Sequence, residues 1–186
     1  MTQTGALADD SVALGLGFMK VLPDKDPLGR GILFMDPSVQ DKTLYERKSM
    51  ARSVWYVIHA ALEEESAQQK GCVVVGYTRN AHLSQVDRGL IKMNIESMNG
   101  CLPLRLSAFH VCHPPTFFQL VIFPIVKLFA GERMRKRVKV HAGKDENVLK
   151  KLEKYGLTND KVPTVLGGTV ELDHKNWLAK RKEAGK

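Results

Sequence analysis

Cysteine is scarce in this chain of 186 residues, which contains only Cys72, Cys101 and Cys112 and has no CxxC pair. An odd and sparse count argues against the disulfide framework that is common in small secreted domains. The sequence therefore predicts a protein of a reducing, cytoplasmic compartment.

Long apolar runs are missing as well. No run approaches the roughly 18 residues that indicate a membrane-spanning helix. The amino-terminal stretch MTQTGALADDSVALGLGF has no basic region and carries Asp9 and Asp10, unlike a secretory signal. We therefore expect neither a transmembrane helix nor a signal peptide.

The signatures of common enzymes are also absent. Gly15 and Gly17 begin a glycine pattern that lacks its third glycine, and the chain contains no P-loop and no GxSxG motif. A cysteine-dependent phosphatase needs a loop of backbone amides closed by an arginine, whereas Cys112 is followed by His-Pro-Pro and no arginine. We expect no catalytic residue and no enzymatic activity.

A metal site is not expected either. His110, Cys112 and His113 lie close together in the sequence, but no second pair of ligands stands at a fixed spacing. We interpret them as a locally bonded strand histidine and a buried free thiol, and we expect no metal and no cofactor.

What the chain does contain is an alternation of strand and helix patterns. Apolar runs predict strands at residues 31–35, 72–77, 104–112 and 138–140. Helical spacing and stop signals predict helices at residues 38–70, 80–99, 116–130 and 147–155, with Asn80 as the cap of the second. Residues 23–29 read as a turn, the first twenty residues as weakly structured, and residues 173–186 as a basic helix or tail. This alternation predicts one α/β domain.

The most unusual stretch is residues 116–130, TFFQLVIFPIVKLFA, which we call the apolar segment. Gln119 and Lys127 alone offer it a polar face, whereas a surface helix normally shows a wide one. Pro124 should kink or break it, because proline lacks an N–H and clashes with the preceding turn. At roughly 20 Å it is too short to cross a bilayer, so it is either a buried core helix or an element that meets an apolar partner.

Excess positive charge follows the apolar segment directly. Residues 1–126 carry twelve cations and twelve anions, whereas residues 127–151 carry nine cations and three anions. Such a local excess indicates an anionic partner, nucleic acid or a membrane surface, unless it is simply a solvated lysine-rich face. Nucleic-acid binding often adds stacking aromatics, but the nearby phenylalanines belong to a segment suited to burial. A membrane surface accounts for the apolar and the basic parts together.

Several blocks of the sequence resemble one family. They are GRGILF at residues 29–34, LPLRLSAFH at 102–110, the stretch from KLF to RKRVKVH at 127–141, VPTVLGGT at 162–169, and Asp173, His174 and Trp177. Their residues and order are similar to those of CRAL-TRIO lipid-binding domains. The resemblance covers roughly residues 24–177, nearly the whole chain.

The resemblance implies an α/β fold in which a mixed, mostly parallel sheet floors a hydrophobic pocket, flanked by helices with a mobile gate helix. It places the gate at residues 116–130 and one lipid inside the pocket. In some members of the family, basic residues at the positions of Arg133 and Arg137 contact phosphoinositide headgroups. We expect a weakly structured segment at residues 1–20, the lipid-binding domain at 21–178 and a basic tail at 179–186.

The sequence departs from this family in four ways. His113 replaces the usual asparagine before proline, and Leu104 replaces the acidic residue that phosphatidylinositol-binding members carry before the arginine. The proline of the family's KPF motif is missing, and Pro124 lies earlier instead. From the given sequence, we expect the family's amino-terminal three-helix module to be missing or reduced to the first twenty residues.

We therefore predict a protein that binds a small hydrophobic ligand or phospholipid and transfers it between membranes. The alternative is a module that senses lipid without transferring it and recruits a partner to membranes. The predicted pocket and gate residues are Leu33, Val73, Val75, Leu106, Phe109, Phe117, Phe118, Val121, Phe123, Ile125 and Phe129. The residues predicted to bind headgroup or membrane phosphate are Arg105, Arg133, Arg135, Lys136, Arg137 and Lys139. The expected partners are the lipid ligand and an anionic membrane surface, with peripheral attachment and no nucleic acid.

Overall fold

A five-stranded sheet forms the centre of the computed structural model, which describes residues 10–100 and 104–186. Its strands are β1 (Met19–Lys25), β2 (Gly31–Met35), β3 (Cys72–Tyr77), β4 (Leu106–Cys112) and β5 (Val138–His141), in the order β1-β2-β3-β4-β5. β1 is antiparallel to β2, and the remaining pairs are parallel. The predicted α/β fold with a mixed, mostly parallel sheet is confirmed.

Strand β1 was not predicted from the sequence. Its second half, residues 23–25, was predicted to be part of a turn. The strand runs through Pro23, and its pairing with β2 is irregular between Val21 and Lys25. Proline is tolerated there because β1 is an edge strand, where a missing N–H breaks no inner ladder. The turn itself is shorter and is held by Asp26, whose carboxylate accepts hydrogen bonds from the backbone N–H groups of Leu28 and Arg30.

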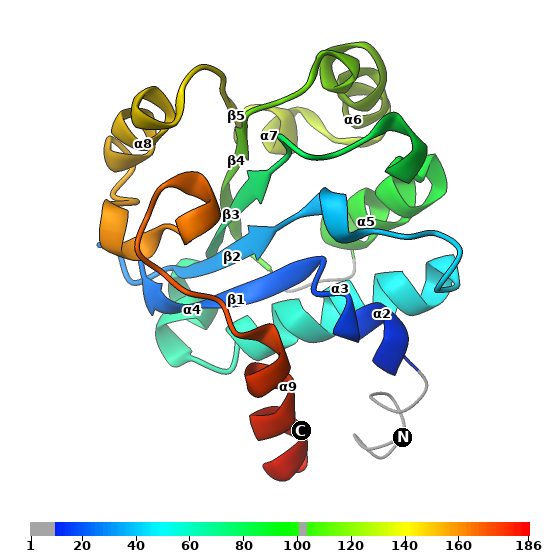
Figure 1. The fold of residues 1–186 in the computed structure, drawn as a ribbon, viewed down its shortest axis with the longest axis vertical. Helices are drawn as coiled ribbons and strands as arrows, with labels where there is room; N and C mark the ends of the chain where they lie inside the picture. Colours follow the sequence, from blue (N-terminus) through cyan, green and yellow to red (C-terminus); the bar gives the residue numbers. More distant parts are fainter. Residues whose placement is uncertain (1–9, 101–103) are drawn as a thin grey trace.

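Helices cover both faces of the sheet (Figure 1). They are α2 (Ser11–Gly15), α3 (Arg47–Ala61), α4 (Glu65–Lys70), α5 (Arg88–Gly100), α6 (Phe123–Phe129), α7 (Glu132–Arg135), α8 (Asp145–Glu153) and α9 (His174–Glu183). Short 3-10 turns are η1 (Pro37–Val39), η2 (Leu83–Gln85), η4 (Asn159–Lys161) and η5 (Thr164–Leu166), and η3 (Phe118–Ile122) is a π-helix.

Two of the predicted helices differ from those observed. The predicted helix 38–70 begins only at Arg47, because Asp36 and Asp41 each accept the backbone N–H two residues on and hold residues 36–43 in turns. It is also interrupted between Ala61, the end of α3, and Glu65, the start of α4. The second helix begins at Arg88 rather than after Asn80, and the Asp87 carboxylate accepts the N–H of Leu90. Asp87 therefore takes the capping role that we assigned to Asn80.

The sheet separates two apolar cores. Leu33 and Val74 belong to the core on the side of α3 and α5, whereas Val75 belongs to the other core with Leu152 of α8. Figure 1 shows α8 on one side of the sheet and α3 and α5 on the opposite side. Burying a side chain of this size stabilises the fold by roughly 1.5–3 kcal/mol.

The carboxyl-terminal residues form a docked helix rather than a free tail. Arg181 of α9 donates to the Glu63 carboxylate at 2.8 and 2.9 Å and to the Tyr56 hydroxyl at 2.8 Å. The hydrogen bond from Arg181 is the main reason why the pKa of Glu63 falls to about 2, and Lys186 adds to the effect.

Candidate functional site

A largely apolar cavity of about 190 Å³ lies on the side of the sheet that faces α3 and α5. Its floor comes from strands β2, β3 and β4, and its walls come from α3, α5 and the apolar segment. Leu33, Val74 and Phe109 lie next to one another on the floor, because they are register partners on adjacent strands.

The structure decides which strand residues face this cavity. Leu33 and Phe109 line it as predicted, whereas Val73 and Val75 point to the opposite face and pack in the second core. Successive strand side chains alternate between faces, so Val74 takes the position between them. Leu106 is buried in the cavity-side core beside the lining residues.

The backbone of the apolar segment stays helical from Thr116 to Phe129, and its helix type changes just before Pro124 rather than breaking there. Residues Phe118–Ile122 form a π-helix, and α6 follows directly from Phe123, with Pro124 as its second residue. Pro124 has no N–H to donate to the preceding turn, and the change of helix type lies in that turn. Phe117, Phe118 and Phe123 line the cavity. Phe118 and Phe123 pack edge to face, with ring centroids 5.4 Å apart.

Three other predicted gate residues do not line the cavity. Val121, Ile125 and Phe129 recur every four residues and form a separate, half-buried stripe of the segment. Phe129 lies beneath Lys92 of α5, whose Nζ is 5.3 Å from the ring centroid.

The outer surface of the apolar segment carries large apolar side chains. Leu120 is 73% exposed and Leu128 is 76% exposed, and the exposed Pro124 lies midway between them. The segment thus presents apolar groups inward to the cavity and outward to solvent.

The apolar segment begins at a strained junction after β4. His113 has a φ of 55°, in the left-handed region that few residues other than glycine, asparagine, aspartate and histidine adopt. Asparagine suits this position for the same reason, which accounts for the tolerance of histidine in its place. Two prolines follow before the segment starts.

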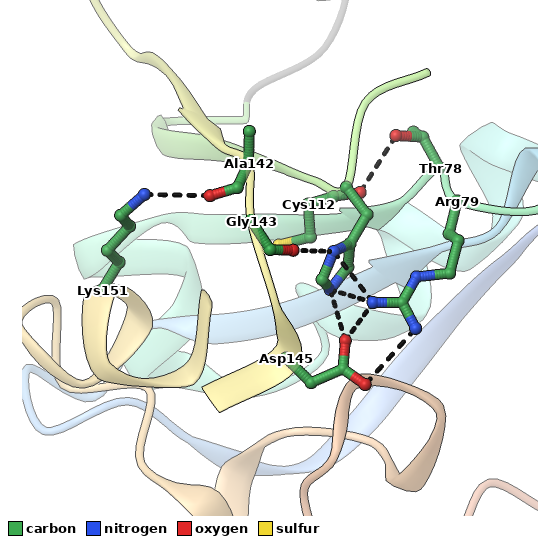
Figure 2. A network of polar contacts seen from close by, with 8 residues as sticks. Thr78, Arg79, Cys112, Ala142, Gly143, Asp145 and Lys151 are labelled. Carbon is green, nitrogen blue, oxygen red and sulfur yellow. Dashed lines mark hydrogen bonds and ion pairs between the residues drawn. The ribbon is translucent and has the colours of Figure 1, made fainter. Parts of the chain in front are cut away.

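A network of polar contacts holds His113 in this conformation (Figure 2). Nδ1 lies 3.1 Å from the Gly143 carbonyl and 3.0 Å from Arg79 Nη2. Nε2 lies 3.2 Å from both Arg79 Nη2 and the Asp145 carboxylate. Arg79 is itself paired with Asp145. The residues come from the carboxyl ends of the parallel strands β3, β4 and β5, so the network joins three strands at the base of the segment.

Electrostatics favour the neutral form of this histidine. Burial lowers the pKa of His113, and the Arg79 guanidinium lowers it further, against an opposing effect of Asp145. A neutral ring can donate from Nδ1 to the Gly143 carbonyl while Nε2 accepts a hydrogen bond from Arg79.

The predicted phosphate-binding residues are only partly brought together. Arg133, Arg135 and Lys136 are exposed on and just after α7, next to the end of the apolar segment, and Arg137 follows them. Arg135 donates to the Lys127 carbonyl at 3.1 Å, which ties α7 to the end of α6. Lys136 pairs with Glu132 at 2.6 Å.

Arg105 and Lys139 lie apart from this group. Arg105 precedes β4 and bonds through its carbonyl to the N–H of Cys72, at the opposite end of the strand from His113. Lys139 of β5 is the register partner of His110, so its side chain starts from the sheet face opposite the cavity.

The polar residues that line the cavity were not predicted from the sequence. Gln40, Thr78, Gln85 and Asn94 line the cavity although no motif marks them. Leu90, Ile91, Ile95 and Met98 of α5 also line it, and their helical spacing was the signal that could have identified them.

Burial makes the thiols of the two described cysteines unreactive. Burial raises the pKa of the Cys72 thiol to about 11 and that of Cys112 to about 12, so neither supplies a thiolate at neutral pH. Cys101 lies outside the described residues. Within residues 10–100 and 104–186, no three His, Cys, Asp or Glu side chains converge as metal ligands would.

A second, more open hollow of about 640 Å³ lies between β1, α4 and α9. Charged residues of both signs line it, and the Lys25–Glu64 ion pair at 2.8 Å is among them. A wet, charged hollow cannot replace a bilayer around an apolar molecule, so the smaller cavity is the better candidate site.

None of the helices in the described part of the chain combines the length and apolar character that a membrane crossing requires. A solved structure described as the crystal structure of Sfh5 superposes with a TM-score of 0.61 at 14% identity, covering 89% of this chain and 66% of that one. At this level of identity, the similarity shows a shared fold and nothing further.

Two kinds of protein are among those with related sequences. The alpha-tocopherol transfer protein-like proteins of mouse and human are 29% identical over 170 residues, which cover 89% of this chain and 48% of each relative. Clavesin-1 of Xenopus laevis is 25% identical over 161 residues, which cover 85% of this chain and 47% of the relative. The chain therefore spans about half the length of these relatives. The model of the CRAL/TRIO domain matches residues 17–168. With that match over most of its length, and with the sheet and helices expected of the resemblance, this chain belongs to the CRAL/TRIO domain family.

Proposed function

We propose that the protein binds a hydrophobic ligand or a phospholipid chain in the cavity and transfers it between membranes. One observation carries the proposal: the apolar segment walls the cavity on one side and exposes Leu120 and Leu128 on the other. A core helix has no reason to keep two large apolar side chains in water, whereas an element that meets a bilayer does.

The size of the cavity supports a movable wall. At about 190 Å³ it is slightly larger than a cavity of about 150 Å³ that binds benzene, and smaller than ligand pockets of roughly 300–1,000 Å³. A lipid therefore enters only when a wall moves outward. We assign that movement to the apolar segment, which acts as the gate.

The membrane supplies the driving force for opening in this mechanism. Moving the gate outward uncovers apolar surface of the cavity, and each uncovered methylene costs about 0.8 kcal/mol in water. A bilayer covers that surface and removes the cost, so the gate opens where membrane is present. In solution the same cost keeps it closed.

The cations beside the gate hold the protein at an anionic surface. Each lysine or arginine near such a surface contributes roughly 1 kcal/mol. Arg133, Arg135 and Lys136 are exposed within a few residues of the gate, so they support peripheral attachment.

Two measurements test this function in sequence. Native mass spectrometry of the purified protein should show a bound lipid, and solvent extraction identifies it. That lipid should then move from donor to acceptor vesicles faster with the protein than without it. Phe118→Asp, which puts a charge on the cavity wall, should reduce the rate at least tenfold, while Val165→Asp on exposed η5 should not.

Lipid binding without movement between vesicles would instead support the alternative of a recruiting module. Absence of both bound lipid and transfer would reject the proposed function.

A further inference from the structure

The gate is fixed to the sheet by a polar junction at its base. None of the described residues of η3 and α6 is buried, so the gate itself packs only loosely. Pro114 and Pro115, which precede it, have no N–H for a backbone hydrogen bond. His113 comes before them, donates its N–H to the His141 carbonyl at 2.8 Å and is only 9% exposed. The conformation of His113 therefore sets the direction in which the chain leaves the sheet.

This conformation is one that the surroundings must maintain. Within residues 10–100 and 104–186, His113 is the only residue other than glycine with a positive φ. Left-handed backbone costs free energy for any residue with a Cβ, and it persists where the surrounding structure holds it. Loss of the contacts around the His113 ring would therefore let the backbone return to a negative φ and turn the base of the gate.

The groups that face the ring come from β3, the loop after it, and the start of α8 (Figure 2). The Tyr77 ring packs edge-on at 6.1 Å between centroids. Arg79 Nη2 lies 3.0 Å from Nδ1 and 3.2 Å from Nε2, and the Asp145 carboxylate lies 3.2 Å from Nε2. The Gly143 carbonyl adds an uncharged acceptor at 3.1 Å. One cation and one anion thus flank a ring that is itself neutral.

A proton on the ring would disturb this arrangement. The neutral ring donates from Nδ1 to Gly143 and accepts from Arg79 at Nε2, whereas the protonated ring has two donors and no acceptor. It would lose the bond from Arg79 and place a positive charge beside the guanidinium. Asp145 compensates only in part, because Arg79 already binds both of its oxygens. In agreement, burial and then Arg79 lower the pKa of His113.

We infer that His113 is a proton-sensitive positioning residue for the gate: the neutral ring holds the base of the gate in place, and protonation releases it. A ring outside the network binds a proton more readily than one inside it, so acid favours the released form. The inference rests on the proposed function, since it concerns the movement of the gate. The asparagine usual at this position in the family adopts left-handed backbone but takes up no proton, so the proton sensitivity is particular to the histidine of this chain.

Hydrogen exchange of the full chain, measured by mass spectrometry and corrected for intrinsic exchange, tests the inference. Peptides from residues 114–130 report on the gate, and peptides from residues 72–77 of β3 report on general loss of stability in acid. The acid-to-neutral ratio is gate exchange at pH 5 divided by gate exchange at pH 7, and it should be about fivefold in the wild type.

His113→Asn is the matched variant. It keeps a residue that tolerates left-handed backbone and removes the proton site, so its ratio should be about one after the change in β3 is subtracted. Lipid transfer between phosphatidylcholine vesicles should be faster at the acid pH in the wild type and not in this variant. His59→Asn removes an exposed histidine of α3 and should leave the wild-type ratio unchanged.

Two neighbouring variants should change the ratio in opposite directions. Arg79→Met removes the cation that opposes the proton, so the closed form accepts it and the ratio should fall. Asp145→Asn removes the anion that favours the proton, so the ratio should rise. Both side chains are about half exposed, at 40% and 47%, so neither substitution should prevent folding.

The outcomes separate this inference from the proposed function. Equal ratios in the wild type and His113→Asn would overturn the role of His113 and leave lipid transfer intact. Should His113→Asn fail to fold, changes in the same direction for Arg79→Met and Asp145→Asn would overturn it as well. Absence of lipid transfer at either pH would overturn the proposed function instead.

Discussion

Two buried histidines share a hydrogen bond on the sheet face away from the cavity. Nδ1 of His110 lies 2.8 Å from Nε2 of His141, and the Tyr155 ring packs edge-on against both. One of the two nitrogens carries the shared proton. Protonating both rings would place two positive charges side by side. Burial, followed by the influence of His141, lowers the pKa of His110 to about 4, and burial also lowers the pKa of His141.

Stability should therefore fall on mild acidification. In the unfolded chain His110 binds a proton near its ordinary pKa of 6.5, whereas in the fold it does so only near pH 4. Between these values the unfolded state holds the extra proton, so acid favours unfolding. At pH 5 the expected loss from His110 is about 2 kcal/mol, measured by urea unfolding at pH 7 and pH 5.

The double variant His110→Phe, His141→Phe should show a smaller loss than the wild type. Some loss should remain, because burial also lowers the pKa values of His113 and His174. Substituting the exposed His59 with glutamine serves as the control for removing a histidine. An unchanged pH dependence in the double variant would contradict this account.

Single residues of the site were predictable only in part. Valines 73, 74 and 75 are all buried, so hydropathy gives no alternation to follow. A shift of one residue moves a side chain to the other face, and only the pairing with β2 and β4 sets that register. Gln40 and Asn94 were missed because nothing in a sequence marks a polar side chain as part of a cavity lining.

At the scale of elements, the apolar segment was predicted better than any other. Its apolar character and its helical length follow from local chemistry alone, whereas the break expected at Pro124 is only a change of helix type. The prediction of a helix at 38–70 was wrong at its beginning, because two aspartates hold residues 36–43 in turns that compete with the helix.

The outer surface of the apolar segment gives a prediction at the scale of elements. Leu120→Asp and Leu128→Asp should weaken binding to phosphatidylcholine vesicles by about fivefold each in a sedimentation assay, because a charge cannot enter the interface without cost. Both side chains are more than 70% exposed, so the melting temperature should change little. Val165→Asp, half exposed on η5, should leave vesicle binding unchanged. Normal binding by the two segment variants would contradict a membrane role for this surface.

At the scale of the whole molecule, charge is unevenly distributed. The net charge is +8, and residues 127–151 hold much of the excess. In Figure 1, α7 and α8 lie on opposite sides of β5. Exposed cations lie on or next to both helices, among them Arg133, Arg135, Lys150 and Lys154.

Reversing charge on each side should therefore have different effects. Arg133→Glu with Arg135→Glu should reduce binding to phosphatidylserine-containing vesicles by tenfold or more, since each cation contributes roughly 1 kcal/mol. Lys150→Glu on α8 with Lys154→Glu directly after it makes the same change in net charge and should have a much smaller effect. Raising salt should weaken wild-type binding and narrow the difference. Equal losses in the two variants would show that net charge alone, and no oriented surface, governs binding.

The sequence by itself determined the α/β class, the four parallel strands, the apolar character of residues 116–130 and the placement of charge after them. These features depend on composition and on spacing within a few residues. Tertiary structure decided the rest: the edge strand through Pro23, the strand face toward the cavity, the junction at His113 and the polar residues of the cavity lining. Each of these depends on which distant residue lies opposite, and that is fixed only when the strands pair and the helices pack.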